Sequence, residues 1–292
     1  MYNLLNQGYF NLICSKIIMI RIKIIIIILL IHCPLTGVLA QWPVLPSGKE
    51  LNPADFTRPY SNASFSGEYI DMVQGHIWQW TLYGGFAFGK NKHGLSAKIP
   101  LVRTVYPGVE ELTGVGDITL SYHLVTYDSK MRVRTLASSA LKLDISIPTG
   151  DPLKGHGAGV PILMPGFSLA YRPVPQIAII PHIKYYHSFG EVDGDWGGGF
   201  PGSIPSDPAL EDNKIRMLFL ECLFNYEFNE AWIGLSPMYS YSFIENDGTL
   251  SLRPQIGKLF AEKVSINLTA SFYIAGRRRL NSWTYFDIRY FF

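Results

Sequence analysis

The chain contains little cysteine: three residues in 292, at Cys14, Cys33 and Cys222. We expect the first two to leave with an N-terminal leader, so that one cysteine remains in the exported protein. One cysteine can form neither an intramolecular disulfide nor a cysteine metal site. The exported protein must therefore be held together by its backbone hydrogen bonds.

An excess of charge of either sign is also lacking. Twenty-five Lys and Arg residues face 23 Asp and Glu residues, which gives a net charge of +2. This balance supplies no electrostatic footprint for nucleic acid, so we expect no nucleic-acid partner. Only 16% of the residues are charged and 48% are hydrophobic, which excludes a disordered chain.

Residues 1–40 have the pattern of a secretory signal peptide. Three basic residues and no acidic residue precede the apolar run Ile24–Ile31, and small residues lead to a cleavage site after Ala40. The uncharged apolar stretch is shorter than the roughly 18 to 20 residues of a membrane-spanning helix. Met19 stands directly before this pattern, so residues 1–18 are interpreted as an upstream extension from a misplaced start codon.

Long hydrophobic runs are absent after Ala40, which excludes membrane-spanning helices there. Strict alternation occurs instead, most clearly in 264–274, where every even position is apolar and nearly every odd position is polar. Such a period of two predicts a strand with one dry face and one wet face. A soluble β-sandwich would show the same alternation.

Strand length and the end of the sequence favour a transmembrane barrel over a sandwich. The alternating segments run for about ten residues, which is the length that crosses a bilayer at a tilt. Residues 283–292 place aromatic side chains at alternate positions and end on Phe292. This pattern resembles the closing strand of bacterial outer-membrane barrels, and Phe292 is the expected assembly signal for the barrel assembly machinery.

We therefore predict an all-β fold: a transmembrane antiparallel up-and-down β-barrel over residues 63–292 in the outer membrane of a Gram-negative bacterium. Residues 41–62 lack a pattern and are expected to form a periplasmic strap or to enter the lumen. An even strand number is typical of single-chain bacterial barrels. The twelve expected strands are 64–73, 76–89, 93–103, 115–127, 132–147, 161–172, 175–189, 214–228, 231–243, 249–259, 263–275 and 281–292.

If the C-terminus lies in the periplasm, this strand count places the short connections on the periplasmic side and the longest connections on the extracellular side. Such barrels are expected to show this asymmetry. The outer connections include 104–114, 148–160 and 190–213, and the last of these is acidic, without Lys or Arg. Arg277, Arg278 and Arg279 fall on the outer rim. Two interpretations of these arginines stay open: contact with phosphates of lipopolysaccharide headgroups, and plain rim charge.

The wet faces of the expected strands gather charges of both signs in the lumen. One hypothesis is a sealed interior network in which these charges neutralise one another. The other is a pore lining that favours polar or weakly anionic solutes. The lumen-lining candidates are Lys98, Asp117, His123, Lys142, Asp144, His182, Lys184, Glu221, Arg253, Asp287 and Arg289.

Three segments resemble a known family. They are Gly114–Leu120, which opens a strand on a Gly-Asp turn, Leu141–Asp151, which ends in Pro-Thr-Gly-Asp, and the glycine-rich Gly155–Gly159. The chain is similar in them to outer-membrane proteins named for the meta-pathway of phenol degradation and described as predicted transporters. The resemblance implies a barrel that passes small, in some cases aromatic, solutes, and it supplies no catalytic residues.

No enzymatic activity and no cofactor or metal is expected. A barrel lipid hydrolase would need Ser, His and an acid together at the outer rim. His76 and His187 are the only candidate pair near that rim, and no Gly-x-Ser-x-Gly elbow is present. The sequence also lacks a Walker loop, a dinucleotide fingerprint and a His-rich metal tract. The function predicted is passive diffusion or uptake of small solutes, with a structural or adhesive sealed barrel as the alternative.

Overall fold

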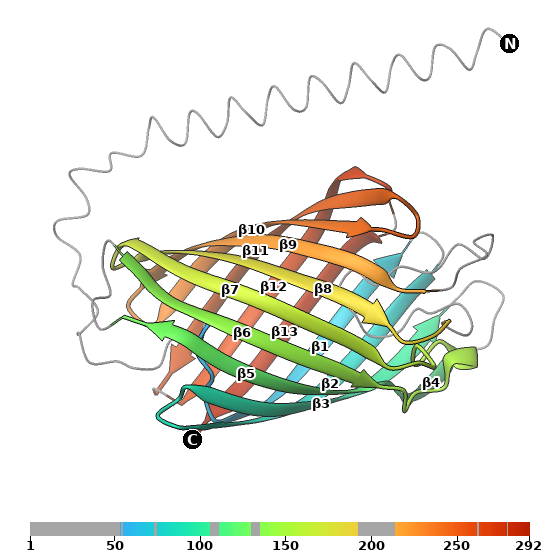
Figure 1. The fold of residues 1–292 in the computed structure, drawn as a ribbon, viewed down its shortest axis with the longest axis horizontal. Coiled ribbons are helices and arrows are strands. Elements are labelled where there is room, and N and C mark those ends of the chain that lie inside the picture. Colours follow the sequence, from blue (N-terminus) through green and yellow to red (C-terminus); the bar gives the residue numbers. More distant parts are fainter. Residues whose placement is uncertain are drawn as a thin grey trace, which may run out of the picture. The chain divides into compact units, whose positions relative to one another are not determined.

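The computed structural model describes residues 53, 55–72, 75–105, 111–129, 135–191, 214–261, 263–278 and 280–292. Strands make up nearly all of this part of the chain (Figure 1). One short 3-10 helix, η1, lies between β6 and β7. No helix among these residues has the length and apolar character needed to cross a membrane. The elements are β1 Asn62–Met72, β2 Gly75–Phe88, β3 His93–Val105, β4 Leu112–Val115, β5 Ile118–Asp128, β6 Thr135–Ile147, η1 Pro152–Lys154, β7 Ile162–Val174, β8 Ile177–Ser188, β9 Arg216–Phe228, β10 Ala231–Ser242, β11 Asp247–Phe260, β12 Val264–Gly276 and β13 Leu280–Phe291.

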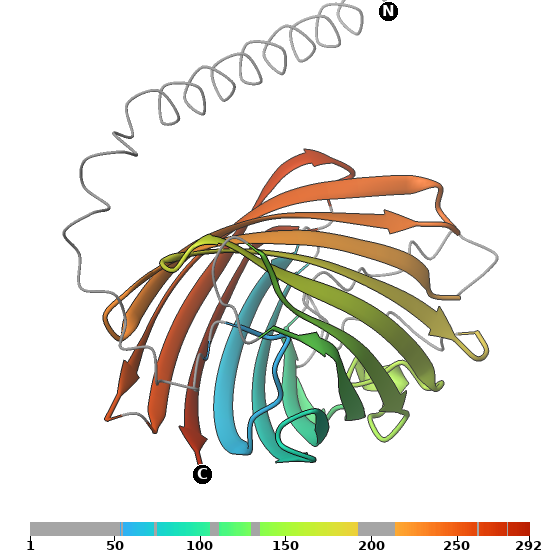
Figure 2. The ribbon, with the colours of Figure 1, turned by 60° about the vertical axis from the view of Figure 1, so that its left-hand side comes forward.

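The strands form one closed antiparallel sheet that surrounds an interior (Figure 2). β1 closes the sheet by pairing with β13. β4 and β5 pair with successive parts of β3, so together they occupy one position in the wall. The thirteen strands therefore make twelve positions, which confirms the predicted twelve-stranded barrel.

Side chains alternate between a dry exterior and a polar interior. On β12, Ile266 and Leu268 are exposed on the outside, whereas Ser265, Thr269 and Ser271 are buried on the inside. The exposed apolar residues recur on every full-length strand, and they include many Leu, Ile and Phe side chains. An apolar outer surface over a polar interior is what a bilayer requires of a barrel.

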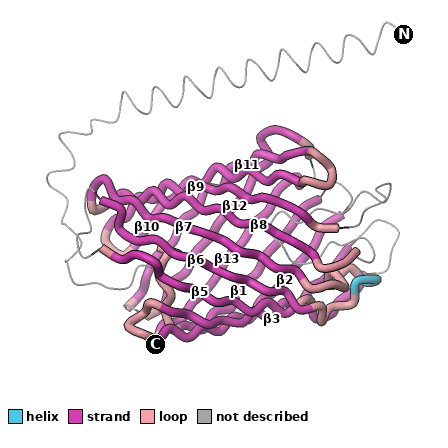
Figure 3. Tube along the Cα trace, in the orientation of Figure 1, coloured by secondary structure: helices cyan, strands magenta, loops and turns pink. Residues whose placement is uncertain are grey.

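The two ends of the barrel differ in how their strands are connected. Short turns join the strands at the end where the C-terminus lies, and η1 lies at the opposite end (Figure 3). The predicted strand 115–127 begins earlier, at Leu112, and it is broken at Gly116 and Asp117 into β4 and β5. At the break, Gly116 packs against Pro100 and the His156 carbonyl, where a side chain would be crowded.

Several predictions lie outside the described residues. These are the signal peptide 1–40, most of the acidic loop 190–213, and Arg279. Of the expected strap 41–62, the structure describes residue 53 and residues 55–62.

Candidate functional site

The barrel lumen contains a cavity of about 490 Å³. Its wall includes residues from the segment that precedes β1, such as Phe56, and residues from the opposite end, such as His156. Of the eleven lumen candidates, Arg253 and Asp287 are not part of the cavity wall, and the others line it: Lys98, Asp117, His123, Lys142, Asp144, His182, Lys184, Glu221 and Arg289.

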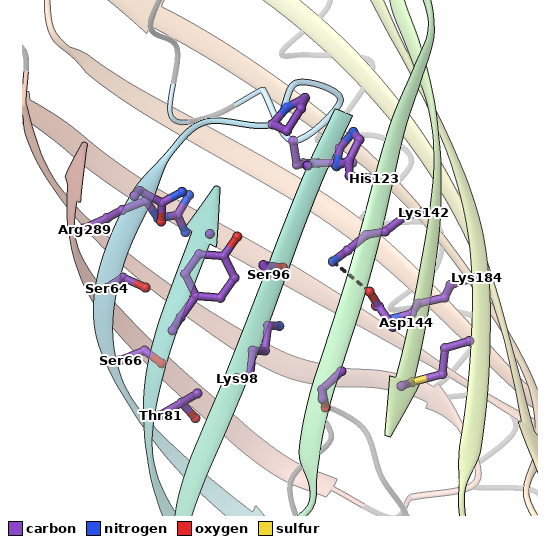
Figure 4. A pocket seen from close by; sticks show the side chains of 18 of the residues that line it. Ser64, Ser66, Thr81, Ser96, Lys98, His123, Lys142, Asp144, Lys184 and Arg289 are labelled. Carbon is purple, nitrogen blue, oxygen red and sulfur yellow. Dashed lines mark hydrogen bonds and ion pairs between the residues drawn. The ribbon is translucent and has the colours of Figure 1, made fainter. Parts of the chain in front are cut away.

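One side of the lumen holds three lysines around a single carboxylate. The Lys184 amine donates to Asp144 Oδ2 at 2.6 Å, and the Lys142 amine lies 3.4 Å from Asp144 Oδ1 (Figure 4). Gly166 on β7 stands directly opposite both lysines. Because glycine has no side chain, Lys184 can reach across β7 to Asp144. Lys98 projects into the same space from β3.

The carboxylates elsewhere in the lumen have partners of their own. Glu68 accepts hydrogen bonds from the Trp283 ring at 3.1 Å and from Gln79 at 3.3 Å. Glu221 accepts one from Ser236 at 2.6 Å and lies 4.0 Å from Arg253. These carboxylates contribute to internal networks on the strands that carry them.

Asp287 and Arg289 form an ion pair of 3.2 Å on β13. Arg253, which is outside the cavity wall, stacks over the Trp283 ring at 4.8 Å. The two predicted lumen residues missing from the cavity wall are thus packed within the interior network. Hydroxyl groups line the wall between Arg289 and Lys98, from Ser64, Ser66, Thr81 and Ser96 (Figure 4).

The segment that precedes β1 enters the lumen at the end where the C-terminus lies. Thr57 is fully buried, its hydroxyl lies 2.5 Å from that of Ser138, and its carbonyl accepts a hydrogen bond from His123 Nε2 at 3.0 Å. The Arg58 guanidinium donates to Asp128 at 2.5 Å. The Phe56 ring meets the ring of His182 edge-on at 5.6 Å. This segment therefore narrows the lumen from inside.

At the other end, Asp117 folds the loop between β6 and β7 onto the barrel wall. Its carboxylate accepts hydrogen bonds from the backbone amides of Thr149 at 3.1 Å, Gly150 at 2.9 Å and Ala158 at 2.7 Å. A side chain at Gly157 would collide with this carboxylate. The glycine-rich motif is thus explained by the close approach of the loop backbone to Asp117.

The same loop carries a buried histidine that sequence reasoning missed. His156 is 3% exposed, and its Nε2 atom has no hydrogen-bond partner among the residues described. A side chain at Gly114 would collide with the His156 ring. The Gly-His-Gly pattern in the sequence could have indicated a closely packed loop. The alternation used for the strands predicts nothing about side chains in loops.

Arg172 and Glu227 were also missed as interior residues. The guanidinium makes a two-pronged contact with the carboxylate, with nitrogen–oxygen distances of 2.9 and 3.0 Å, and both residues are buried. The expected strand 161–172 ends at Arg172, whereas β7 continues to Val174. Such forked contacts are strong and directional.

The rim arginines differ from one another. Arg277 forms ion pairs with Asp247 at 3.0 Å and with Glu245 at 3.8 Å. The expectation of lipid-headgroup contact therefore concerns a residue that already has carboxylate partners. Arg278 is exposed.

The histidines considered for hydrolysis do not come together. His76 is on β2 and His187 is on β8, with β3, β5, β6 and β7 between them. Within the described ranges, no cluster of three or more His, Cys, Asp or Glu residues could hold a metal ion. Inside the barrel, by contrast, the Ser168 hydroxyl lies 2.7 Å from His182 Nδ1, and both residues line the lumen cavity.

Solved structures with a similar fold are bacterial outer-membrane barrels. An outer-membrane channel from Pseudomonas putida F1 matches with a TM-score of 0.62 at 12% identity, covering 83% of this chain and 100% of that one. The NanC porin matches with a TM-score of 0.52 at 7% identity, covering 79% of this chain and 98% of that one. The KdgM porin matches with a TM-score of 0.51 at 10% identity, covering 79% and 99%. No family model and no curated protein matches the chain.

Identities this low establish a shared fold and nothing finer. The apolar exterior and polar interior supply the physical argument for the membrane. Together they define the class: a transmembrane β-barrel of the bacterial outer membrane, with the fold of outer-membrane channels.

Proposed function

We propose that the protein is a passive channel for small polar solutes, with a preference for weakly anionic ones. The observation that carries this proposal is the cavity in the lumen, where Lys98, Lys142 and Lys184 surround the one carboxylate of Asp144. A permeating solute must exchange water for these side chains, so their charge influences which ions pass.

The finer expectation concerns aromatic solutes. The resemblance to the family named for phenol degradation motivates it, and the cavity wall includes the rings of Tyr83, Tyr186 and Tyr285. Small aromatic acids would combine a ring for these surfaces with a negative charge for the lysines. We include them in the proposed solute class.

The test is single-channel conductance of the refolded protein in planar bilayers, with ion selectivity measured from reversal potentials. Replacing Lys142 and Lys184 together by Ala should shift selectivity toward cations, because Asp144 then lacks its partners. Leu143→Ala, on the outer face of the same strand, is the matched control and should leave selectivity unchanged.

The competing function is a structural or adhesive barrel whose lumen is sealed. The segment docked around Thr57 and the internal ion pairs favour it. A wild-type protein that inserts into bilayers and conducts no ions or solutes would support the sealed barrel and remove the channel proposal.

A further inference from the structure

Lys98 differs from the other two lysines of the cavity. Its side chain is exposed to the cavity, and no hydrogen bond or ion pair joins it to another residue in the described part of the chain. Lys184, by contrast, is held by Asp144 at 2.6 Å and also lies over the ring of Tyr186 at 5.1 Å. Lys98 is therefore the amine that remains available to a solute.

The nearby carboxylate cannot neutralise all three lysines. Asp144 carries one negative charge, and it is shared between Lys184 and the more distant Lys142. The group of four side chains therefore keeps an excess of positive charge. Glu68 faces the same cavity and brings a second carboxylate, so three lysines and two carboxylates still leave an excess of one positive charge.

Hydroxyl groups adjoin the free amine. Ser96 lies two residues before Lys98 on the same face of β3, and Thr119 is the register partner of Lys98 on β5. Both line the cavity, as Lys142 does. Figure 4 shows Ser96, Lys98 and Lys142 projecting into one space. Two amines and two hydroxyls thus line the same cavity from three neighbouring strands, β3, β5 and β6.

We infer that Lys98 and Lys142, with the hydroxyls of Ser96 and Thr119, form a discrete binding site for one small monocarboxylate solute. An ionised carboxylate only accepts hydrogen bonds, through two oxygens, and this site offers it donors. A solute with a second negative charge would meet Asp144 and Glu68 across the same cavity. A single carboxylate therefore fits the local charge better than a dianion.

This inference rests on the proposed channel function and adds the expectation that solute flux saturates at high solute concentration. A channel without a site passes solute in proportion to concentration, whereas a site that holds one carboxylate limits the flux when it is filled. Binding must also be weak enough for the solute to leave.

The experiment compares benzoate with benzamide, which has nearly the same shape and no charge. Benzoate should reduce single-channel chloride current with a saturable concentration dependence, and benzamide should not. Isothermal titration of the refolded protein in detergent with benzoate then measures occupancy of the site independently of conduction.

Lys98→Met should weaken benzoate binding by about tenfold or more, since hydrogen bonds to charged groups are among the stronger ones in proteins. Lys98→Arg, which keeps the charge, should retain most of the binding. The matched control is Lys258→Met, which removes the same charge from the exposed face of β11. Heat-modifiable gel migration verifies that each variant has folded.

Each outcome separates the site from the channel. A conducting wild type in which benzoate neither blocks nor binds would overturn the site and leave the channel intact. Benzoate binding without any conductance would remove the channel function. Equal loss of binding in Lys98→Met and Lys258→Met, or equal binding of benzamide, would show that no discrete carboxylate site exists at Lys98.

Discussion

The two ends of the lumen are narrowed by different chemistry. At the outer end, where η1 lies, one carboxylate, that of Asp117, accepts hydrogen bonds from three backbone amides of a single loop. At the inner end, where the C-terminus lies, a segment before β1 is held by contacts spread over several side chains, among them Thr57 with Ser138 and Arg58 with Asp128. The hydrogen bonds at the outer end therefore meet on the single side chain of Asp117, whereas the contacts at the inner end are spread over several side chains.

The two ends of the lumen should therefore respond differently to the loss of a single side chain. Loss of Asp117 would remove all three bonds to the loop at once. Loss of one residue in the segment before β1 leaves the remaining contacts in place. The inner end should therefore be more tolerant of single changes, except where a buried charge would be left without its partner.

The largest loss of stability is expected from Arg172→Met at the inner end, because this change leaves a buried charge unpaired. It leaves the buried Glu227 carboxylate without its guanidinium partner, which should destabilise the barrel by about 3–5 kcal/mol. Urea unfolding of the refolded protein, followed by tryptophan fluorescence, measures the loss. The double variant Arg172→Met with Glu227→Met should recover most of it. No recovery would mean that the charge left behind is not the cause.

Asp117→Asn should have the next largest effect. One acceptor oxygen becomes an NH₂ group that faces a backbone N–H, so at least one charge-assisted bond worth about 1.5–3 kcal/mol is lost. Hydrogen exchange of residues 148–160 should become faster while exchange in the strands stays unchanged. Asp151→Asn is the control on the same loop, because Asp151 pairs with the exposed Lys154. Equal acceleration in both variants would contradict the role assigned to Asp117.

Thr57→Val should weaken docking of the inner segment by about 1–2 kcal/mol, since the hydroxyl that contacts Ser138 and Asp55 is lost from a buried position. Limited proteolysis should then cut before β1 more readily, with the barrel itself intact. Thr249→Val, at a hydroxyl in the exposed outer part of β11, serves as the control. Unchanged proteolysis would mean that the remaining contacts suffice without Thr57.

The smallest effect is expected from Arg58→Ala. Its partner Asp128 is 46% exposed, and exposed ion pairs contribute about 0–1 kcal/mol. A double-mutant cycle with Asp128→Ala, read by the same proteolysis, measures the coupling between them. A coupling as large as that of Arg172 with Glu227 would show that the inner end depends on one contact after all.

Alternation in the sequence predicted the wall of the barrel well. The period of two placed Lys142, Asp144 and Lys184 on the wet faces of their strands, which is where the structure has them. The same pattern placed Leu143 outside. Strand patterns succeed here because a bilayer enforces the same separation along every strand.

Contacts across strands and loops could not be predicted in that way. The open position that Gly166 leaves between two lysines depends on register, which alternation does not fix. The break in the wall at Asp117 depends on backbone amides from a loop distant in sequence. The docking of Thr57 follows a segment without any periodicity, so only the folded chain reveals its partners.

The seam between β1 and β13 has a consequence for biogenesis. It pairs Asn62 with Phe291 and Asp71 with Ser282, so the first and last described strands meet only when the barrel closes. Closing so long a stretch of chain is slow compared with forming local hairpins. The segment around Thr57 directly precedes β1 and ends up inside the sheet. It must therefore either lie on the inner face before the seam forms or enter afterwards through an open mouth, which makes the order of these two events a step of barrel assembly.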